Sequence, residues 1–301
     1  MLFFQIVLLA GYGYAHFTTK LFSLKWQVGL HITIMAVVLT LLPIGIATGW
    51  TPPVEEPPVP WLIGLFAVSV GLPFFAVATN APLLQRWFSH TNHRTAADPY
   101  FLYAGSNLGS ILALLSYPLL FEPLLTSQEQ SVVWGWAYAL LIGLLLLCSV
   151  TMGRRYSTTV TPFLVQTAIQ SDEVPTLSRR LHWLALAFVP SSLLLGVTMH
   201  ITTDVAAVPL LWVLPLTLYL LTFVFVFARR PWLPHTWMVL AQPFFIIPIG
   251  VQRFGGILLD IFLPMAVFFV TTMVCHGELA KRRPGANHLT EFYLWLSLGG
   301  M

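Results

Sequence analysis

Long runs of apolar residues, separated by short polar segments, divide this chain into predicted helices. A bilayer core demands about 20 consecutive apolar residues of helix, and nine runs approach that length before a shorter last one. The predicted spans are residues 1–16, 27–49, 61–82, 101–121, 132–152, 182–203, 208–228, 235–252 and 256–276, with a partial span from 289. The pattern predicts an all-α polytopic membrane protein with nine to ten transmembrane helices.

Composition favours the same class. The 301 residues are 57% hydrophobic and 8% charged, whereas soluble domains carry about 25% charged residues. The net charge of +3 is no sign of nucleic-acid binding, because basic residues in membrane proteins concentrate in cytoplasmic loops. No phosphate-binding loop and no nucleophile motif is present. We expect no catalytic residues, no cofactor and no nucleic-acid partner for this chain.

The basic residues fall in alternate loops. All of the 14 Lys and Arg residues except Arg253 lie in the odd-numbered loops, while the opposite loops hold Glu55, Glu56 and Glu129. This bias follows the positive-inside rule. It predicts a multi-pass protein of the cell membrane, with the basic loops in the cytoplasm and Met1 on the outer side.

The longest loop divides the chain into two parts. Residues 153–181 are polar and predict a cytoplasmic hinge between an N-terminal helix half, residues 1–152, and a C-terminal half, residues 182–301. Another loop, TPPVEEPPVP, is rich in proline and acid. Its prolines predict an extended connector that is not helical.

Two cytoplasmic loops resemble one another, together with the helices that follow them. They read APLLQRWFSHTNHRTAADPYFLYAGSNLGS and HGELAKRRPGANHLTEFYLWLSLGGM. Each has a basic cluster, an Asn-His pair and an acid before an aromatic helix start; Tyr100 matches Phe292, 192 positions on (292 − 100). The alternative is a chance match between two aromatic helix starts. A parallel repeat predicts two pseudo-repeated halves in a major-facilitator arrangement, with one helix missing at each end.

The helix within residues 98–122 has two unusual faces. Gly105, Gly109, Ala113 and Ser116 recur at helical spacing and predict close packing against another helix. Polar residues including Tyr103, Asn107 and Ser110 form the other face. They predict a polar seam or cavity, and so a solute pathway.

Further polar residues in the spans are candidates for a substrate or ion pathway. His200 and Asp204 share a helix face if the segment is helical, and a carboxylate–imidazole pair could move a proton. The alternative is a short outer turn in which Asp204 is solvated or caps a helix. Asn80, beside Pro82 and after Pro73, predicts a broken third span that lines a cavity or is merely kinked.

The predicted cytoplasmic loops carry charged residues, for which helix capping is favoured over a salt-bridge network that gates a pathway. Glu291 fits a helix N-terminus, where the dipole favours acid, and a gating salt-bridge network is the alternative. The loop charges in question are Arg86, Arg94, Glu278, Lys281, Arg282, Arg283 and Glu291. His90 and His93 have metal-compatible spacing, but without a cysteine or carboxylate cluster we expect no metal site. His16 and His31 are lone histidines near span ends, for which simple packing is favoured.

Several segments resemble the membrane region of bacterial fused major-facilitator/spermidine-synthase-like proteins. They are LPFFAVATNAPLLQRWF, DPYFLYAGSNLGSILALLSYPLLFEP, AAVPLLWVLPLTLYLLTF and CHGELAKRRPGANHLTEFYLWLSLGG. The resemblance implies an inner-membrane domain followed by a cytoplasmic synthase-like domain, which would carry any aminopropyl transfer. The chain ends within LSLGGM, before such a domain, so none of the family's catalytic residues carries over.

The leading hypothesis is a transporter-like domain in the lipid bilayer, handling a small solute such as a polyamine. Few membrane acids are available for a polycation, which weakens that choice of solute. The alternative is a non-transporting anchor for a cytoplasmic aminopropyltransferase-like domain. A membrane-embedded enzyme is a third and weaker hypothesis, since only His200 with Asp204 approaches an acid/base set.

Overall fold

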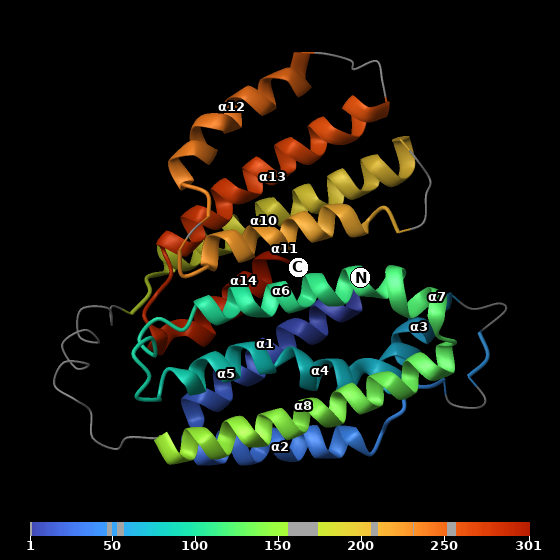
Figure 1. Cartoon of the computed structure of the whole chain (residues 1–301), viewed down its shortest axis with the longest axis vertical. Coiled ribbons are helices and arrows are strands. Elements are labelled where there is room, and N and C mark those ends of the chain that lie inside the picture. Colours follow the sequence, from blue (N-terminus) through green and yellow to red (C-terminus); the bar gives the residue numbers. More distant parts are fainter. Residues whose placement is uncertain are drawn as a thin grey trace.

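A computed structural model describes residues 2–46, 50–52, 57–155, 174–205, 210–230, 232–251 and 257–301, and every regular element in these ranges is helical (Figure 1). The first group of helices is α1 (Leu2–Leu21), α2 (Leu24–Leu39), α3 (Pro58–Phe66), α4 (Leu72–Ala78), α5 (Asn80–Phe88), α6 (Phe101–Ser116), α7 (Glu122–Leu124) and α8 (Ser127–Arg155). The second group is α10 (Leu177–Met199), α11 (Val213–Phe227), α12 (His235–Val251), α13 (Ile257–Lys281) and α14 (Leu289–Gly299). The predicted all-α class is confirmed.

Many of these helices have the length and apolarity of membrane spans. Within the described ranges, the helical segments that reach that length are Pro58–Phe88, Phe101–Leu124, Ser127–Gly153, Leu177–Thr203 and Leu259–Lys281. Shorter apolar helices are Leu24–Leu39, Val213–Phe227 and His235–Ile247. The protein is therefore of the membrane-embedded helical type.

Two predicted boundaries around the proline-rich connector are wrong. α2 ends at Leu39 rather than near residue 49, because Pro43 lacks an N–H and restricts the residue before it. α3 begins at Pro58, inside the segment predicted to be non-helical. Proline is tolerated in the first turn of a helix, where its missing N–H would have no partner.

The predicted central loop is shortened at both ends by helix. α8 continues to Arg155 and α10 begins at Leu177. The start of α10 is capped by Thr176, whose Oγ1 accepts a hydrogen bond from the Arg179 backbone N–H at 3.3 Å. Helix therefore extends into a stretch whose polar composition indicated only loop.

Wider π-helical turns interrupt the spans where proline disturbs the backbone ladder. Ala67–Gly71 form one such turn between α3 and α4, and Tyr117–Phe121 form another between α6 and α7. Pro73 cannot donate to the Ser69 carbonyl, which lies in the first of these turns, and Pro118 lies within the second. A single turn residue, Thr79, also separates α4 from α5, within the continuous helical segment Pro58–Phe88.

The two helix groups meet through two pairs of helices, and each pair takes one helix from each group. α6 of the first group packs on α11 of the second, and α14 of the second packs on α1 of the first. Around them, α10 lies on α13 and α14, α12 lies on α13, and α8 lies on α2 (Figure 1). We call the boundary formed by α1, α6, α11 and α14 the seam.

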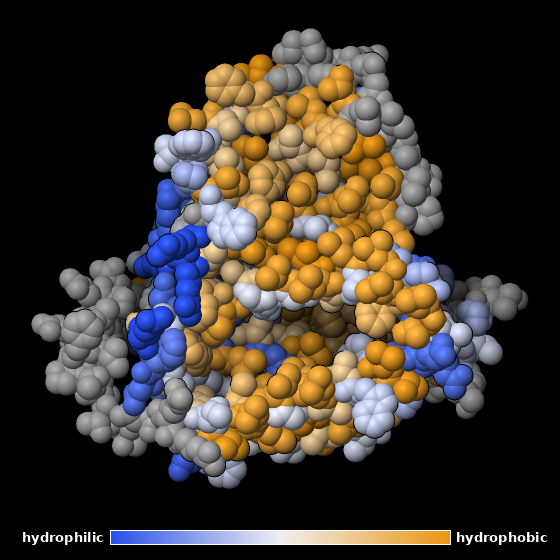
Figure 2. Space-filling model, viewed as in Figure 1, coloured by the Kyte–Doolittle hydropathy of each residue, from blue (hydrophilic) through white to orange (hydrophobic). Residues whose placement is uncertain are grey.

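Polar and apolar surfaces are separated on the outside of the molecule. Hydrophilic residues gather in a band at one end, at the left of Figure 2, while the flanks of the helices are mostly apolar. Arg86, Asp98, Arg180 and Arg283 all lie at the helix ends on this side. We call it the basic end. Such a division is typical of helices whose flanks contact lipid.

Candidate functional site at the seam

The middle of the seam is filled by aromatic rings from both helix groups. Tyr103 of α6 lies 5.1 Å from Phe223 and 5.4 Å from Phe227 of α11, and 5.0 Å from Tyr293 of α14, between ring centroids. Phe223 and Phe227 are four residues apart, so they share one helix face. Edge and tilted ring contacts of this kind add to the burial of apolar area.

Hydroxyl and amide groups are set among these rings. The Tyr293 hydroxyl donates to Gln85 Oε1 at 2.7 Å, and both side chains are buried. Tyr219 and Ser191 share a hydrogen bond of 3.2 Å. Tyr12 brings a further phenol, with its ring centroid 6.3 Å from that of Tyr293. The chemistry here suits hydrogen bonding to an uncharged group rather than ion pairing.

At the basic end, charged and polar side chains connect the two groups directly. Arg86 donates to the Ala286 carbonyl at 2.8 Å and to Asn287 Oδ1 at 3.1 Å. Arg283 and Asp98 form an ion pair of 2.7 Å. We call these contacts the basic-end lock. They hold the first group against the loop between α13 and α14.

Tyr100 adds a buried member to this lock. Its hydroxyl donates to the Pro284 carbonyl at 3.0 Å, and its side chain is buried just ahead of α6. Burial raises the pKa of Tyr100 far above its usual range. The phenol therefore remains a neutral donor at any physiological pH.

Glu291 lies in a second layer of the lock. It accepts from Arg180 at 2.6 Å and lies 3.3 Å from His288 Nδ1. Its neighbour Thr290 bonds across the seam to His16 Nδ1 at 3.1 Å. The residue before α14 makes no side-chain cap hydrogen bond. Glu291 lies in the first turn of α14, the helix N-terminal position predicted for it, and it also makes the contacts of the network alternative.

The pathway candidates of the sequence lie in several places. His200 Nε2 lies 3.3 Å from the Asp260 carbonyl oxygen, in a π-helical segment, His200–Val205. That segment is helical, as the pairing of His200 with Asp204 requires, but the Asp204 side chain is outside the described residues. Asn80 binds His31 Nε2 at 3.1 Å through its Oδ1 and donates to the Ala76 carbonyl at 3.0 Å. It joins the third predicted span to α2, away from the seam.

The two faces of α6 have different surroundings. Tyr103 faces the seam, and buried Asn107 donates to the Tyr103 carbonyl at 2.8 Å. Ser110 is exposed and bonds back to the Ser106 carbonyl. The predicted packing face is open: Gly105, Gly109 and Ala113 are exposed and Ser116 is half-buried. In the described structure this face has no close helix partner.

The remaining loop charges lie outside the seam. Glu278 pairs with Lys281 at 3.0 Å and with Arg282 at 3.4 Å, both on its own helix end, and with His235 at 2.9 Å. Arg94 is exposed. His90 and His93 bond to Arg86 and Thr95 respectively. Among the described residues no group of three metal-ligating side chains occurs.

Several seam residues have no distinguishing signal in the sequence. They belong to no motif, and each bonds to or packs against a distant element; they are Gln85, Tyr12, Tyr219 and Ser191. His16, for which simple packing was favoured, bonds to a threonine 274 residues away. Only the crossed packing of the two groups brings these residues together.

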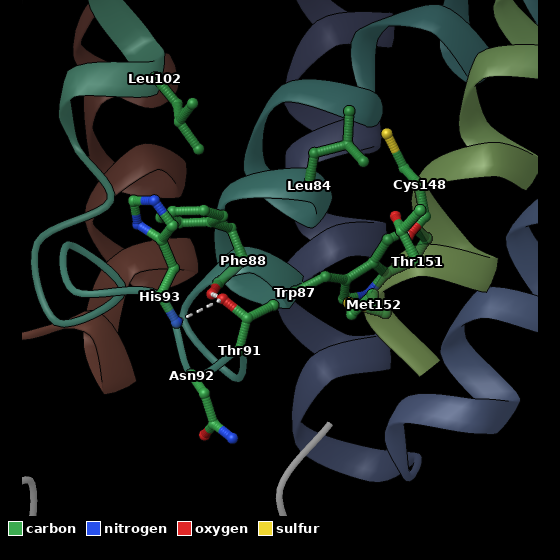
Figure 3. A pocket seen from close by; sticks show the side chains of 10 residues that line it. All are labelled: Leu84, Trp87, Phe88, Thr91, Asn92, His93, Leu102, Cys148, Thr151 and Met152. Carbon is green, nitrogen blue, oxygen red and sulfur yellow. Dashed lines mark hydrogen bonds between the residues drawn. The ribbon is translucent and has the colours of Figure 1, made fainter. Parts of the chain in front are cut away.

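A groove opens beside the seam, in the first helix group. It has a volume of about 690 Å³ and lies between α5, α6 and α8 near the basic end (Figure 3). Its lining residues are mostly apolar: Leu84, Trp87, Phe88, Thr91, Asn92, His93, Leu102, Cys148, Thr151 and Met152. Figure 2 shows that the molecule is hollowed below α6.

Comparison with known proteins found no family model, no curated protein and no solved structure that matches this chain.

Proposed function

We propose that this chain is a transporter-like membrane domain whose two halves move against each other at the seam, as in major-facilitator proteins. The observation that carries the proposal is the crossed pairing of α6 with α11 and of α1 with α14. If α1 is the counterpart of α11, and α6 is the counterpart of α14, then the α6–α11 pair and the α1–α14 pair are equivalent contacts in the two halves. Parallel repeats related in this way are a recurrent design of secondary transporters.

The contacts at the basic end support a closed state on that side. Arg86, Asp98 and Tyr100 all bind the segment Arg283–Asn287, which comes from the opposite half. Surface ion pairs of this kind contribute only about 0–1 kcal/mol each. A lock made of several weak contacts suits an interface that opens and closes on the μs–ms timescale of domain motion. If the basic loops lie in the cytoplasm, as the proposed function assumes, then the seam is closed toward the cytoplasm in this state.

The solute would be small and polar. The seam offers phenols and amides from Tyr12, Gln85, Tyr219 and Tyr293, while its acids Asp98 and Glu291 are paired with arginine. Polyamines are the first solutes to test, because of the resemblance to spermidine-synthase-like proteins. Neutral hydroxylated solutes are the second group, because they match the hydrogen-bonding phenols and amide of the seam.

One observation favours a different function. The rings of Tyr103, Phe223 and Tyr293 fill the described middle of the seam and contact one another. A permanently filled seam suits a membrane anchor for an aminopropyltransferase-like domain. The two functions differ in one respect, namely whether the seam has to open.

The test is uptake into proteoliposomes with a reversible cross-link. Asp98→Cys with Arg283→Cys, in a chain lacking Cys148 and Cys275, places two thiols across the lock. We expect flux of a labelled polyamine or neutral solute that oxidation stops and a reductant restores. Glu278→Cys with Lys281→Cys is the matched control, because both lie on α13. Absence of flux above empty vesicles across the solute panel would favour the anchor.

A further inference from the structure

A cavity lies at the basic end of the second helix group, where α11 ends, α12 begins and α13 ends. α13 packs against both of the other helices (Figure 1). The cavity has a volume of about 540 Å³ and is lined by Val226, Leu233, Pro234, His235, Met273, Gly277, Ala280, Lys281 and Arg283. We call it the basic pocket. Along α13 its wall changes from apolar at Met273 to basic at Lys281, over about 12 Å of helix.

The close approach of α12 to α13 at this pocket depends on one glycine. His235, the first residue of α12, lies over Gly277 of α13. A Cβ added at Gly277 would lie 2.9 Å from the Cε1 of His235 and still closer to its Nδ1. A larger residue at 277 would therefore displace the imidazole. The ring also reaches Glu278, and its Nε2 lies 2.9 Å from Glu278 Oε1.

The charges around the basic pocket leave it positive. The carboxylate of Glu278 is enclosed by donors, because it lies 2.9 Å from His235, 3.0 Å from Lys281 and 3.4 Å from Arg282. Arg283 pairs with Asp98. Three permanent cations thus face two acids. Lys281 uses one of its three N–H donors on Glu278 and Arg283 uses one of its five on Asp98, so both retain donors for an anion.

Two tryptophans flank the lip of the pocket. Trp232 precedes Leu233 and Trp237 lies in the first turn of α12, and their side chains are 73% and 68% exposed. The ring of Trp232 stacks on Phe225 of α11 at 5.6 Å between centroids. Tryptophan is enriched where a membrane meets water. The pocket therefore opens at the depth at which lipid headgroups lie.

A neighbouring hollow differs from the basic pocket in its walls. It has a volume of about 390 Å³ and is lined by Thr176, Ser178, Arg179, His182, Lys281 and Arg282. All of these side chains are polar or charged, which suits a solvated ion. The basic pocket shares Lys281 with this hollow but adds apolar walls from α11 and α13. A solvated ion has no use for such walls.

We propose that the basic pocket binds one anionic phospholipid. Its phosphate lies at Lys281 and Arg283, and the start of an acyl chain lies against Val226, Leu233 and Met273. Basic pockets between transmembrane helices bind anionic lipid headgroups. A zwitterionic lipid gains less from a positive pocket, because it brings a cation together with its phosphate. The inference depends on the membrane-embedded helices and holds whether or not the protein transports a solute.

Thermal unfolding of the full chain in detergent tests the proposal. The added probes are phosphatidylglycerol, phosphatidylcholine and inorganic phosphate, each at the same concentration. A ligand that binds only the folded state raises the melting temperature. We expect a rise with phosphatidylglycerol and little change with the other two. Native mass spectrometry of the same samples should show one retained phosphatidylglycerol.

Variants locate the binding site. Lys281→Gln should weaken phosphatidylglycerol binding about fivefold, as expected for one basic residue near an anionic lipid, and Lys281→Arg should preserve it. Lys20→Gln, at the exposed end of α1, is the matched control for loss of one positive charge and should leave binding unchanged. Leu233→Glu places an acid in a wall that the neighbouring hollow lacks. It should abolish the shift caused by phosphatidylglycerol.

Four results would overturn the proposal. They are equal shifts with the two lipids, a shift with inorganic phosphate as large as that with phosphatidylglycerol, equal weakening by Lys20→Gln and Lys281→Gln, and full binding by Leu233→Glu. Each shift is measured between lipid-loaded and lipid-free samples of one variant. A change in the stability of the variant itself therefore does not imitate a change in binding.

Discussion

α6 and α14 begin alike but are held differently. Each follows a loop at the basic end, and each places aromatic side chains in the seam at its start. α14 is buried between α1 and α10, and most of its residues are buried. α6 is covered by α11, while its glycine face is open. α6 and α14 thus begin with similar sequences but differ in how much of their surface is buried, because different helices surround them.

The sharpest test of this difference is a bulky residue at a glycine of each helix. Gly299→Leu forces a side chain into the Leu184 backbone and the Ala187 side chain. We expect a loss of about 3 kcal/mol in stability, the upper part of the usual overpacking range. Gly109→Leu meets open space and should change little. Thermal unfolding in detergent measures both, and equal losses would contradict the comparison.

A second contrast concerns the acids near the two helix starts. Glu291 is 7% exposed and paired with Arg180, so Glu291→Gln should cost about 2 kcal/mol, as for hydrogen bonds to charged groups. The side chain of Asp98, ahead of α6, is 58% exposed, and Asp98→Asn should cost less than about 1 kcal/mol. The same unfolding measurement decides. A larger loss of stability for Asp98→Asn than for Glu291→Gln would contradict the expectation that the buried acid contributes more.

A third contrast removes one hydroxyl from each helix. Tyr293→Phe leaves buried Gln85 Oε1 without its donor, and we expect a loss of about 1 kcal/mol. Tyr103 contributes mainly ring contacts, so Tyr103→Phe should be close to neutral. If the two variants unfold alike, the Tyr293–Gln85 bond contributes little to the seam.

The smallest effect is expected in the loop that leads to α6. Burial, and secondly the charge of Arg86, lower the pKa of His90 below its usual value. The unfolded chain then binds more protons in acid than the folded chain, so stability falls as pH drops through about 6.5. His90→Gln should flatten this slope slightly relative to the unsubstituted chain. Unfolding midpoints between pH 7.5 and 5.5 supply the comparison.

Much of the fold was predictable, because a bilayer imposes one length and one polarity on every spanning helix. All ten predicted spans correspond to helices. The errors lie near Pro43 and Pro58, where proline acts differently before, within and after a helix.

The seam was only partly predictable. Tyr103 could be identified as facing a polar boundary, because its helix has a polar face. Gln85, Tyr219 and His16 could not, since each acquires its role from a partner on a helix far along the chain. The open face at Gly105 and Gly109 illustrates the same limit, because the spacing predicts a packing face, whereas the described structure leaves it without a close helix partner.

The proposed transport function requires the seam to open at its basic end. Spin labels at Asp98→Cys and Arg283→Cys, in a chain lacking Cys148 and Cys275, report the separation of the two halves in lipid nanodiscs. Double electron–electron resonance should show a short distance together with a longer population that grows or shrinks when a transported solute is added. A single short distance under every condition would contradict a moving seam and leave the chain as an anchor.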